Sequence, residues 1–153
     1  MPFIKTETGA YFEYRFTTSF EETNLVGNIY FANYALWQGK CREMFIKEYC
    51  SDVVKEINDG LKLITVDLGL QFVSQLFALQ DVVIRMSLEA QSEFRMMMNF
   101  EYYRSENEAL HLVCKGHQST TSMKLVDDVL TLVPFPKSMI DAVEQYKLIQ
   151  QTI

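Results

Sequence analysis

Apolar residues recur along the chain at two different spacings, which separate one long helix from a series of strands. From residue 34 to residue 49 the intervals are three and four, which places the apolar side chains on one face of a helix. These residues are Tyr34, Trp37, Cys41, Met44, Phe45 and Tyr49. Asn33 is the expected N-cap, since its side-chain oxygen can accept a hydrogen bond from the first turn. A polar turn from Glu21 to Asn28 precedes the helix, and Gly27 supplies the backbone freedom that such a turn needs.

Elsewhere apolar and polar residues alternate, which is typical of strands that bury one face. The alternation predicts a strand from Ala10 to Ser19, after a short polar arm at residues 1–9. Four long strands are then expected at residues 64–72, 82–90, 94–102 and about 110–123. In the first of these, one face is expected to carry Ile64, Val66, Leu68, Leu70 and Phe72. A polar connection is expected from Ser51 to Asp59, closing in a turn at residues 58–60.

The order of these elements predicts the fold class. After a short apolar run at residues 129–133, Pro134 and Pro136 stop strand pairing, and a terminal helix opens at residues 136–138. Sequential long strands joined by short turns favour an antiparallel sheet, whose apolar face needs a cover. The helix that carries Trp37 is the natural cover. We therefore predict an α+β protein with a long antiparallel sheet wrapped around a central helix and a C-terminal helix, as one domain over residues 1–153.

Charge and cysteine content narrow the function. The formal net charge of −6 argues against generic binding to nucleic acid or to an anionic membrane surface. No stretch has the roughly 18 uninterrupted apolar residues of a membrane-spanning helix. The three cysteines, Cys41, Cys50 and Cys114, lack metal-like spacing and indicate reduced, buried thiols in a cytoplasmic protein.

Common catalytic motifs are missing, so no metal or cofactor is expected. The sequence contains no GxSxG, P-loop, GxGxxG or HExxH. His111 and His117 are better explained as polar strand residues. The methionine triplet at residues 96–98 is better explained by core packing or by an adaptable apolar pocket than by a soft-metal site. Asn24 lies just ahead of a helix N-terminus, where negative charge is favoured, and Arg42 has no carboxylate three or four residues away. From residue chemistry alone, Asn24 is a turn former, and Arg42 is a solvated cation or one paired with a strand.

One long motif changes this interpretation. It consists of ETNLVGNIYFANY at residues 22–34, followed by Trp37 and by CREMF at residues 41–45. It resembles the signature of hot-dog thioesterases of the 4-hydroxybenzoyl-CoA thioesterase type. The order of elements resembles that family over nearly the whole chain. The wording TNxxGNxYFxNY…WQGxCREMF is most similar to thioesterases associated with enediyne polyketide synthases.

The resemblance implies a site and also a departure from the wider family. In the 4-hydroxybenzoyl-CoA branch an aspartate acts as nucleophile or base at the position of Asn24, whereas an amide cannot ionise. The enediyne-associated group shares this departure, so hydrolysis without an acidic catalyst is implied. The resemblance assigns the thioester carbonyl to the backbone N–H of Phe31 and the water or thioester oxygen to Asn24. It assigns a β-keto or enolate oxygen to Arg42, and a supporting hydroxyl to Tyr34. The implied substrate-binding residues are Gly27, Tyr30 and Trp37.

The implied reaction releases a polyene β-keto acid from the acyl carrier protein domain of an iterative polyketide synthase, and the acid then loses CO₂. Hot-dog domains place the site between two subunits, so a homodimer is implied, doubled to a tetramer. An acidic carrier protein is expected to dock on a cluster drawn from Lys40, Lys47, Arg85, Arg104 and Lys115. Two alternatives remain. One is a general acyl-CoA thioesterase, and the other is a non-catalytic polyene- or lipid-binding protein, for which the missing acid argues.

Overall fold

The protein is an antiparallel sheet curled around one helix, as a computed structural model shows for residues 3–6, 9–90 and 92–151. The strand order is β1-β2-β4-β5-β6-β3, with β7 paired to β6. The strands are β1 (Ile4–Thr6), β2 (Gly9–Thr17), β3 (Leu61–Phe72), β4 (Asp81–Ala90), β5 (Arg95–Glu106), β6 (Ala109–Val126) and β7 (Val129–Leu132). The helices are η1 (Phe20–Glu22), α1 (Ala32–Tyr49), α2 (Val53–Asn58) and α3 (Lys137–Gln151). This arrangement confirms the predicted α+β class, the central helix and the C-terminal helix.

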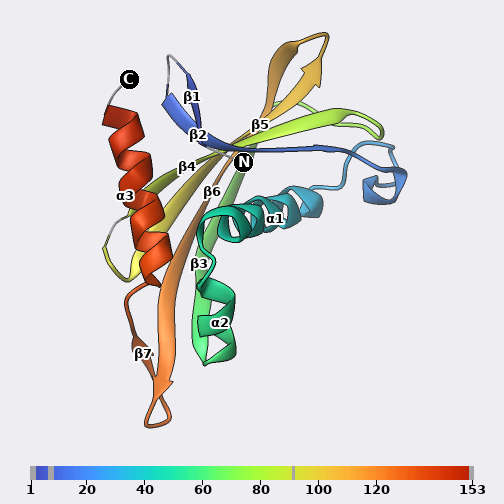
Figure 1. The fold of residues 1–153 in the computed structure, drawn as a ribbon. Coiled ribbons are helices and arrows are strands. Elements are labelled where there is room, and N and C mark those ends of the chain that lie inside the picture. The colour runs from blue at the N-terminus through green and yellow to red at the C-terminus, as the bar shows by residue number, and fades with distance from the viewer. Residues whose placement is uncertain (1–2, 7–8, 91, 152–153) are drawn as a thin grey trace.

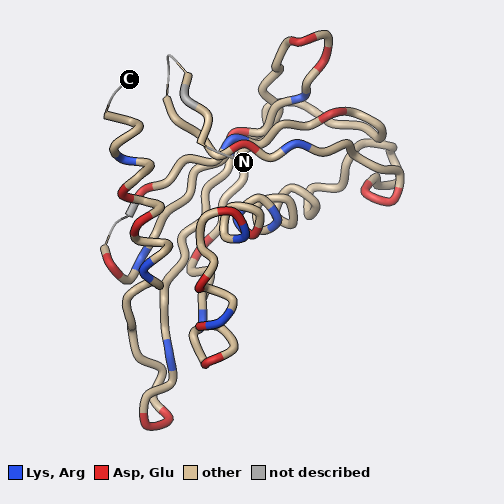
Figure 2. The backbone as a smooth tube through the Cα atoms, in the orientation of Figure 1, with Lys and Arg blue, Asp and Glu red and all other residues tan. Residues whose placement is uncertain are grey.

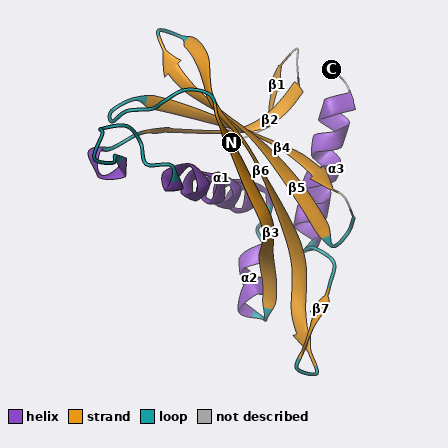
Figure 3. Cartoon of the chain, turned by 180° about the vertical axis from the view of Figure 1, so that it is seen from behind, coloured by secondary structure: helices purple, strands orange, loops and turns teal. Residues whose placement is uncertain are grey.

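The apolar face of α1 forms the centre of the core. Tyr34, Trp37, Cys41 and Phe45 are buried there, as their spacing predicts, and the sheet passes over them (Figures 1 and 3). Helix α3 packs beside α1 and against β2 and β4. The two helices therefore cover one face of the sheet. No helix in the described part of the chain is long and apolar enough to cross a membrane.

The start of α1 differs from the sequence-based expectation. Phe31 precedes the first helical residue, so the predicted N-cap at Asn33 is wrong. The side-chain nitrogen of Asn33 instead donates to the backbone oxygen of Glu22 at 2.8 Å. The carboxylate of Glu22 accepts hydrogen bonds from the backbone N–H of Ser19 at 2.9 Å and from Trp37 Nε1 at 2.7 Å. Asn33 and Glu22 thus tie the polar turn to the helix, which positions the loop between them.

Two segments predicted to be polar and irregular are ordered elements. Ile4–Thr6 forms β1, paired with β2, and the ring of Phe3 stacks on Tyr49 with centroids 4.6 Å apart. The prediction of a polar arm is therefore wrong for residues 3–6 and for Gly9, which begins β2, while residues 1–2 and 7–8 lie outside the described residues. The predicted connection after α1 contains helix α2, because Val53 is fully buried and anchors it. The turn predicted at residues 58–60 is confirmed, with Gly60 at φ +106°.

Strand β3 does not present a single apolar face. Its pairing with β6 shifts register between Thr65 and Asp67, so the side chains change face at this bulge. On the helix side, Leu68 and Leu70 pair with Gln118 and Gly116, and beyond the bulge Thr65 continues that face opposite Thr120. The prediction that Ile64 and Val66 share the face of Leu68 and Leu70 is wrong, because strict alternation fails at a bulge. The bulge lies where polar residues of β6 face α1.

Candidate active site

A tight loop precedes α1 and fixes the position of Asn24. The backbone N–H of Asn24 donates to the oxygen of Asn28 at 2.9 Å, and the N–H of Gly27 donates to the oxygen of Asn24 at 3.0 Å. Thr23 and Ile29 pair as a short antiparallel bridge that closes the loop. Gly27 has φ +89°, a conformation that favours glycine. The predicted turn is thus confirmed, and Gly27 shapes it.

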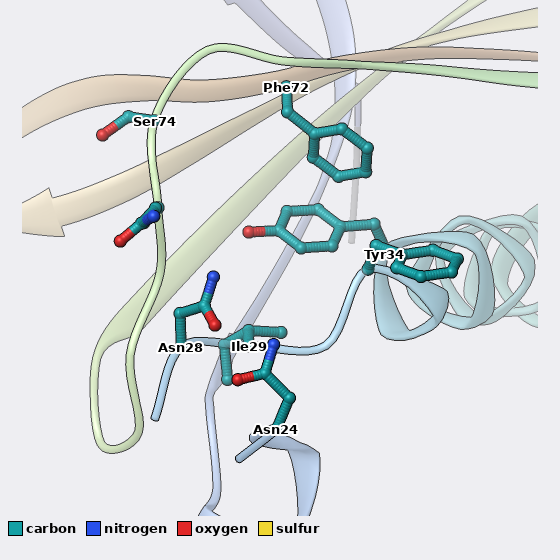
Figure 4. A pocket seen from close by; sticks show the side chains of 8 residues that line it. Asn24, Asn28, Ile29, Tyr34, Phe72 and Ser74 are labelled. Carbon is teal, nitrogen blue, oxygen red and sulfur yellow. The ribbon is translucent and has the colours of Figure 1, made fainter. Parts of the chain in front are cut away.

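The side chain of Asn24 is oriented by its own loop. Its Oδ1 accepts a hydrogen bond from the backbone N–H of Val26 at 3.0 Å. Because a backbone N–H can only donate, the group that meets it must be the amide oxygen. The amide nitrogen is then left on the cavity side of the loop, as Figure 4 shows. Asn24 therefore presents hydrogen-bond donors to the cavity.

A cavity of about 260 Å³ opens between this loop, the start of α1 and the segment after β3 (Figure 4). Its wall includes Asn24, Asn28, Phe31, Tyr34, Ser74 and Gln75. The backbone N–H of Phe31 has no hydrogen-bond partner among the described residues. Free N–H groups and the helix dipole at this end of α1 favour negative charge. The described residues that line the cavity include no carboxylate.

Tyr34 contributes a protonated hydroxyl to this wall. Its ring packs edge-on against Phe72 with centroids 5.0 Å apart. Burial raises the pKa of Tyr34 to about 12, with a smaller contribution from Cys114, while a backbone hydrogen bond from Leu76 opposes the rise. The phenol therefore keeps its proton at neutral pH and can donate a hydrogen bond.

Sequence reasoning missed the other polar groups of the cavity. Asn28 lies within the quoted motif, where its residue type indicates only a turn. Its side-chain oxygen is buried and has no hydrogen-bond partner in the described part of the chain. Ser74 and Gln75 follow β3 in a segment without periodicity, so no signal marked them. The cavity thus offers an unused acceptor, at Asn28, beside the donors of Asn24 and Phe31.

Arg42 lies on the side of α1 that faces β3 and β6. One of its terminal nitrogens donates to Gln118 Oε1 at 2.6 Å and to Thr65 Oγ1 at 3.3 Å. Burial lowers the pKa of the guanidinium, Glu43 opposes this, and an arginine keeps its charge in either case. Within the described residues, no carboxylate lies within 4 Å of Arg42. A half-buried cation is therefore held by neutral partners.

One chain does not bring Arg42 to the cavity that holds Asn24. Arg42 follows Phe31 by eleven positions on the same helix, a separation of about 16 Å along its axis. It is not among the described residues that line the cavity. A thioester carbonyl and its β-keto oxygen are only a few ångströms apart. Asn24, Phe31 and Tyr34 thus lie together, and Arg42 of the same chain lies elsewhere.

The predicted substrate-binding residues Gly27, Tyr30 and Trp37 are not among the described residues that line the cavity. Tyr30 and Asn24 line a second, open hollow on the outer side of the loop, together with Glu21. Trp37 is buried and donates to Glu22. Both oxygens of the Glu22 carboxylate accept hydrogen bonds within the fold. Glu21 is exposed and is the carboxylate of this hollow.

The basic residues expected to bind a carrier protein are spread over several elements. Figure 2 shows basic positions along α1, the sheet and α3. Lys40 and Lys47 lie on α1, while Arg85 and Arg104 lie on β4 and β5. Arg85 Nε is 3.1 Å from a carboxylate oxygen of Glu13, and Arg104 Nε is 3.5 Å from one of Glu106. Lys115 lies on β6, paired across the strands with Glu101.

Comparison with known proteins agrees with the fold. Residues 18–143 match the family model of the thioesterase-like superfamily. The solved dynemicin thioesterase is 35% identical, covering 89% of this chain and 96% of its own, with a TM-score of 0.84. At 15% identity, a 1,4-dihydroxy-2-naphthoyl-CoA thioesterase from Synechocystis (TM-score 0.80, covering 90% of this chain and 98% of its own) shares the fold. A 4-hydroxybenzoyl-CoA thioesterase does so too, at 15% identity with a TM-score of 0.72, covering 86% and 96%.

No curated protein sequence matches the chain. The family match nevertheless spans most of its length and includes the loop of Asn24 and the whole of α1. The chain therefore belongs to the thioesterase-like superfamily and is a thioester hydrolase with the hot-dog fold.

Proposed function

We propose that this single domain hydrolyses a polyene β-ketoacyl thioester held on the acyl carrier protein domain of an iterative polyketide synthase, in the cytoplasm and in enediyne biosynthesis. The observation that best supports this proposal is the cavity at the start of α1. There Asn24 and the backbone N–H of Phe31 offer hydrogen-bond donors, and the described lining residues include no carboxylate. The quoted motif and the 35% identity to the dynemicin thioesterase, whose structures concern polyene binding, support the substrate class.

Catalysis would proceed by oxyanion stabilisation without a general base. The thioester carbonyl oxygen sits against the N–H of Phe31 and the amide nitrogen of Asn24, and each such donor is worth on the order of 3 kcal/mol. A water molecule, which donates a hydrogen bond to the unused side-chain oxygen of Asn28, attacks the carbonyl carbon. The carbon–sulfur bond then breaks, and the proton of the water passes through solvent to the departing thiolate. The β-keto acid that forms loses CO₂ afterwards.

A second copy of the chain would supply Arg42. Strand β3 is the last strand of the sheet, and Val66, Leu68 and Phe72 on it are 48%, 39% and 50% exposed. An apolar, unpaired edge of this kind is suited to pairing with another copy. Pairing along β3 would place the helix of one copy beside the cavity of the other. Arg42 would then hold the β-keto oxygen of a substrate bound mainly by the other copy, in a dimer that doubles to a tetramer.

The experiment is a comparison of three substrates with the purified protein. They are a long-chain β-ketoacyl group on a carrier protein, the same acyl group on coenzyme A, and a saturated acyl group of equal length on the carrier. We expect the highest kcat/KM with the β-ketoacyl carrier substrate. Faster turnover of the coenzyme A substrate would favour the general acyl-CoA thioesterase. Tight binding of a polyene without product would favour the non-catalytic alternative.

The matched control concerns Glu21, the exposed carboxylate that lines the outer hollow together with Asn24. Glu21 lines the outer hollow beside Asn24, so it is the residue best placed to act as a base. Glu21→Gln preserves size and hydrogen bonding but cannot accept a proton. We expect its kcat/KM to stay close to the wild-type value. A loss of 100-fold or more would replace the base-free mechanism by one that uses Glu21.

A further inference from the structure

Two buried glutamines form a hydrogen-bonded chain with Arg42, and the proposed hydrolysis steps give neither of them a role. Gln118 on β6 is 2% exposed and Gln38 on α1 is 0% exposed. Glutamine is usually an exposed residue, so two of them in a core require partners. Gln118 Oε1 accepts from Arg42 at 2.6 Å, and Gln118 Nε2 lies 3.5 Å from Gln38 Oε1. Gln38 Nε2 donates to the backbone oxygen of Gly69 at 3.3 Å.

The sheet makes room for this pair of amides. A Cβ atom at Gly116 would lie 2.2 Å from Gln38 Nε2 and 3.2 Å from the backbone oxygen of Gly69. Any other residue at position 116 would displace Gln38, so the glycine in the middle of β6 is explained by the glutamine on α1. The hydroxyl of the neighbouring Tyr102 accepts a hydrogen bond from the side chain of Gln38 and donates one to the backbone oxygen of Tyr34 at 2.8 Å. The polar chain therefore runs from Arg42 to the first turn of α1.

The choice of an amide next to Arg42 matters for charge. A carboxylate at position 118 would also hold the guanidinium, but it would neutralise it. Gln118 occupies one terminal nitrogen of Arg42 without adding a negative charge, so Glu43 is the carboxylate that acts on the guanidinium. The other nitrogens of the planar guanidinium are then available to an oxygen of the substrate. An uncharged acceptor therefore holds Arg42 without weakening its attraction for an anion.

We propose that Gln118, held in place by Gln38, is a positioning residue that aims Arg42 at the β-oxygen of the substrate. This inference rests on the proposed function. It adds that preference for β-ketoacyl over saturated acyl groups depends on two residues that touch no substrate. Gln118 acts only through Arg42, so its effect on the reaction must disappear when Arg42 is removed.

The test compares Gln118→Glu and Gln118→Met with the wild type, on β-ketoacyl and saturated acyl thioesters of equal length. Gln118→Glu keeps the acceptor and neutralises Arg42, and Gln118→Met removes the acceptor at similar volume. We expect both to lower kcat/KM for the β-ketoacyl substrate by about 10-fold or more, and for the saturated one by less than about threefold. Adding Gln118→Met to Arg42→Ala should cause no further loss.

The control is Ser122→Ala, which removes a buried hydroxyl of the same strand that donates to the oxygen of Pro134. It should leave the ratio of the two substrates unchanged. If the Gln118 variants do not fold, Gln38→Met breaks the same chain from the helix side. Equal losses on both substrates, or a further loss in the Arg42→Ala background, would overturn the inference. The proposed function fails separately, if wild type and Arg42→Ala show the same substrate ratio.

Discussion

The side-chain oxygen of Asn24 accepts a hydrogen bond from the backbone N–H of Val26 at 3.0 Å, so the amide nitrogen is the group left for the cavity. One side chain thus shapes the loop with its acceptor and faces the cavity with its donor. Substitution can separate these roles. Aspartate keeps the acceptor that Val26 needs, whereas alanine removes both groups.

We expect Asn24→Asp to fold as the wild type and to be less active on a β-ketoacyl thioester. It loses the donor and places a negative charge where an oxyanion must form, so kcat should fall by about 100-fold or more. Asn24→Ala loses the same donor without adding charge, so its kcat should fall less. Single-turnover rates and thermal melts of the three proteins measure this. An Asn24→Asp protein faster than the wild type would show that the site works with a base.

Local sequence patterns predict some parts of this fold and not others. The loop, the helix face of Trp37 and the antiparallel sheet follow from local patterns and agree with the structure. The bulge at Val66 does not, because a register shift depends on the partner strand and leaves no periodic signal. Phe3 was missed for a related reason. Strand β1, which follows Phe3, has three residues and is too short to show alternation. The ring on which Phe3 stacks, that of Tyr49, is remote in sequence.

The candidate site was predictable in part for the same reason. Asn24, Phe31 and Tyr34 lie within one contiguous motif, so a resemblance could find them, and the structure places them around one cavity. Gln118 lies 76 positions from Arg42, and no local rule connects them. The two side chains meet because strand β6 lies against α1 in the folded chain.

Removal of the guanidinium should affect substrates unequally. Arg42→Ala is expected to lower kcat/KM for a β-ketoacyl thioester by about 100-fold and for a saturated one by about 10-fold or less, since only the former has a second oxygen. Arg42→Lys keeps the charge but loses the planar fork, so it should fall between these proteins. Steady-state kcat/KM values of each variant, measured on β-ketoacyl and saturated thioesters of equal length, test this expectation. The same loss on both would mean that Arg42 supports the fold or binds the carrier arm.

The plot of kcat/KM against pH should show no fall at low pH of the kind that protonation of a catalytic carboxylate causes. Burial raises the pKa of Tyr34 to about 12, and a raised pKa means that the phenol keeps its proton to higher pH. Tyr34 therefore stays a donor between about pH 6 and 9, and kcat/KM should not decline toward the alkaline side of that range. Tyr34→Phe should lower the rate without changing the shape of the profile. An essential group that titrates with a pKa near 6 or 7 would contradict this.

Chelation should leave hydrolysis unchanged. The proposed steps use hydrogen-bond donors of Asn24 and Phe31 and the charge of Arg42, and no step uses a metal ion. Dialysis against EDTA is therefore expected to preserve kcat within experimental error. The control is the same protein dialysed without chelator. Activity that disappears and returns with one equivalent of a divalent cation would replace this mechanism by Lewis-acid activation of the carbonyl.

The assignment of Asn24 and Arg42 to different copies has a direct consequence for mixed oligomers. Sedimentation should show a dimer or tetramer at micromolar concentration. In a mixture of Asn24→Ala and Arg42→Ala chains, a heterodimer contains one site with both changes and one with neither. Random exchange of equal amounts should therefore restore about a quarter of the wild-type activity. If both residues served one site from the same chain, every site would carry one change and mixing would restore nothing. Because each parent is nearly inactive on the β-ketoacyl substrate, a rise of activity on mixing is measured against a low background. The control is a mixture of Asn24→Ala with Asn24→Asp, in which no exchange can produce an intact site.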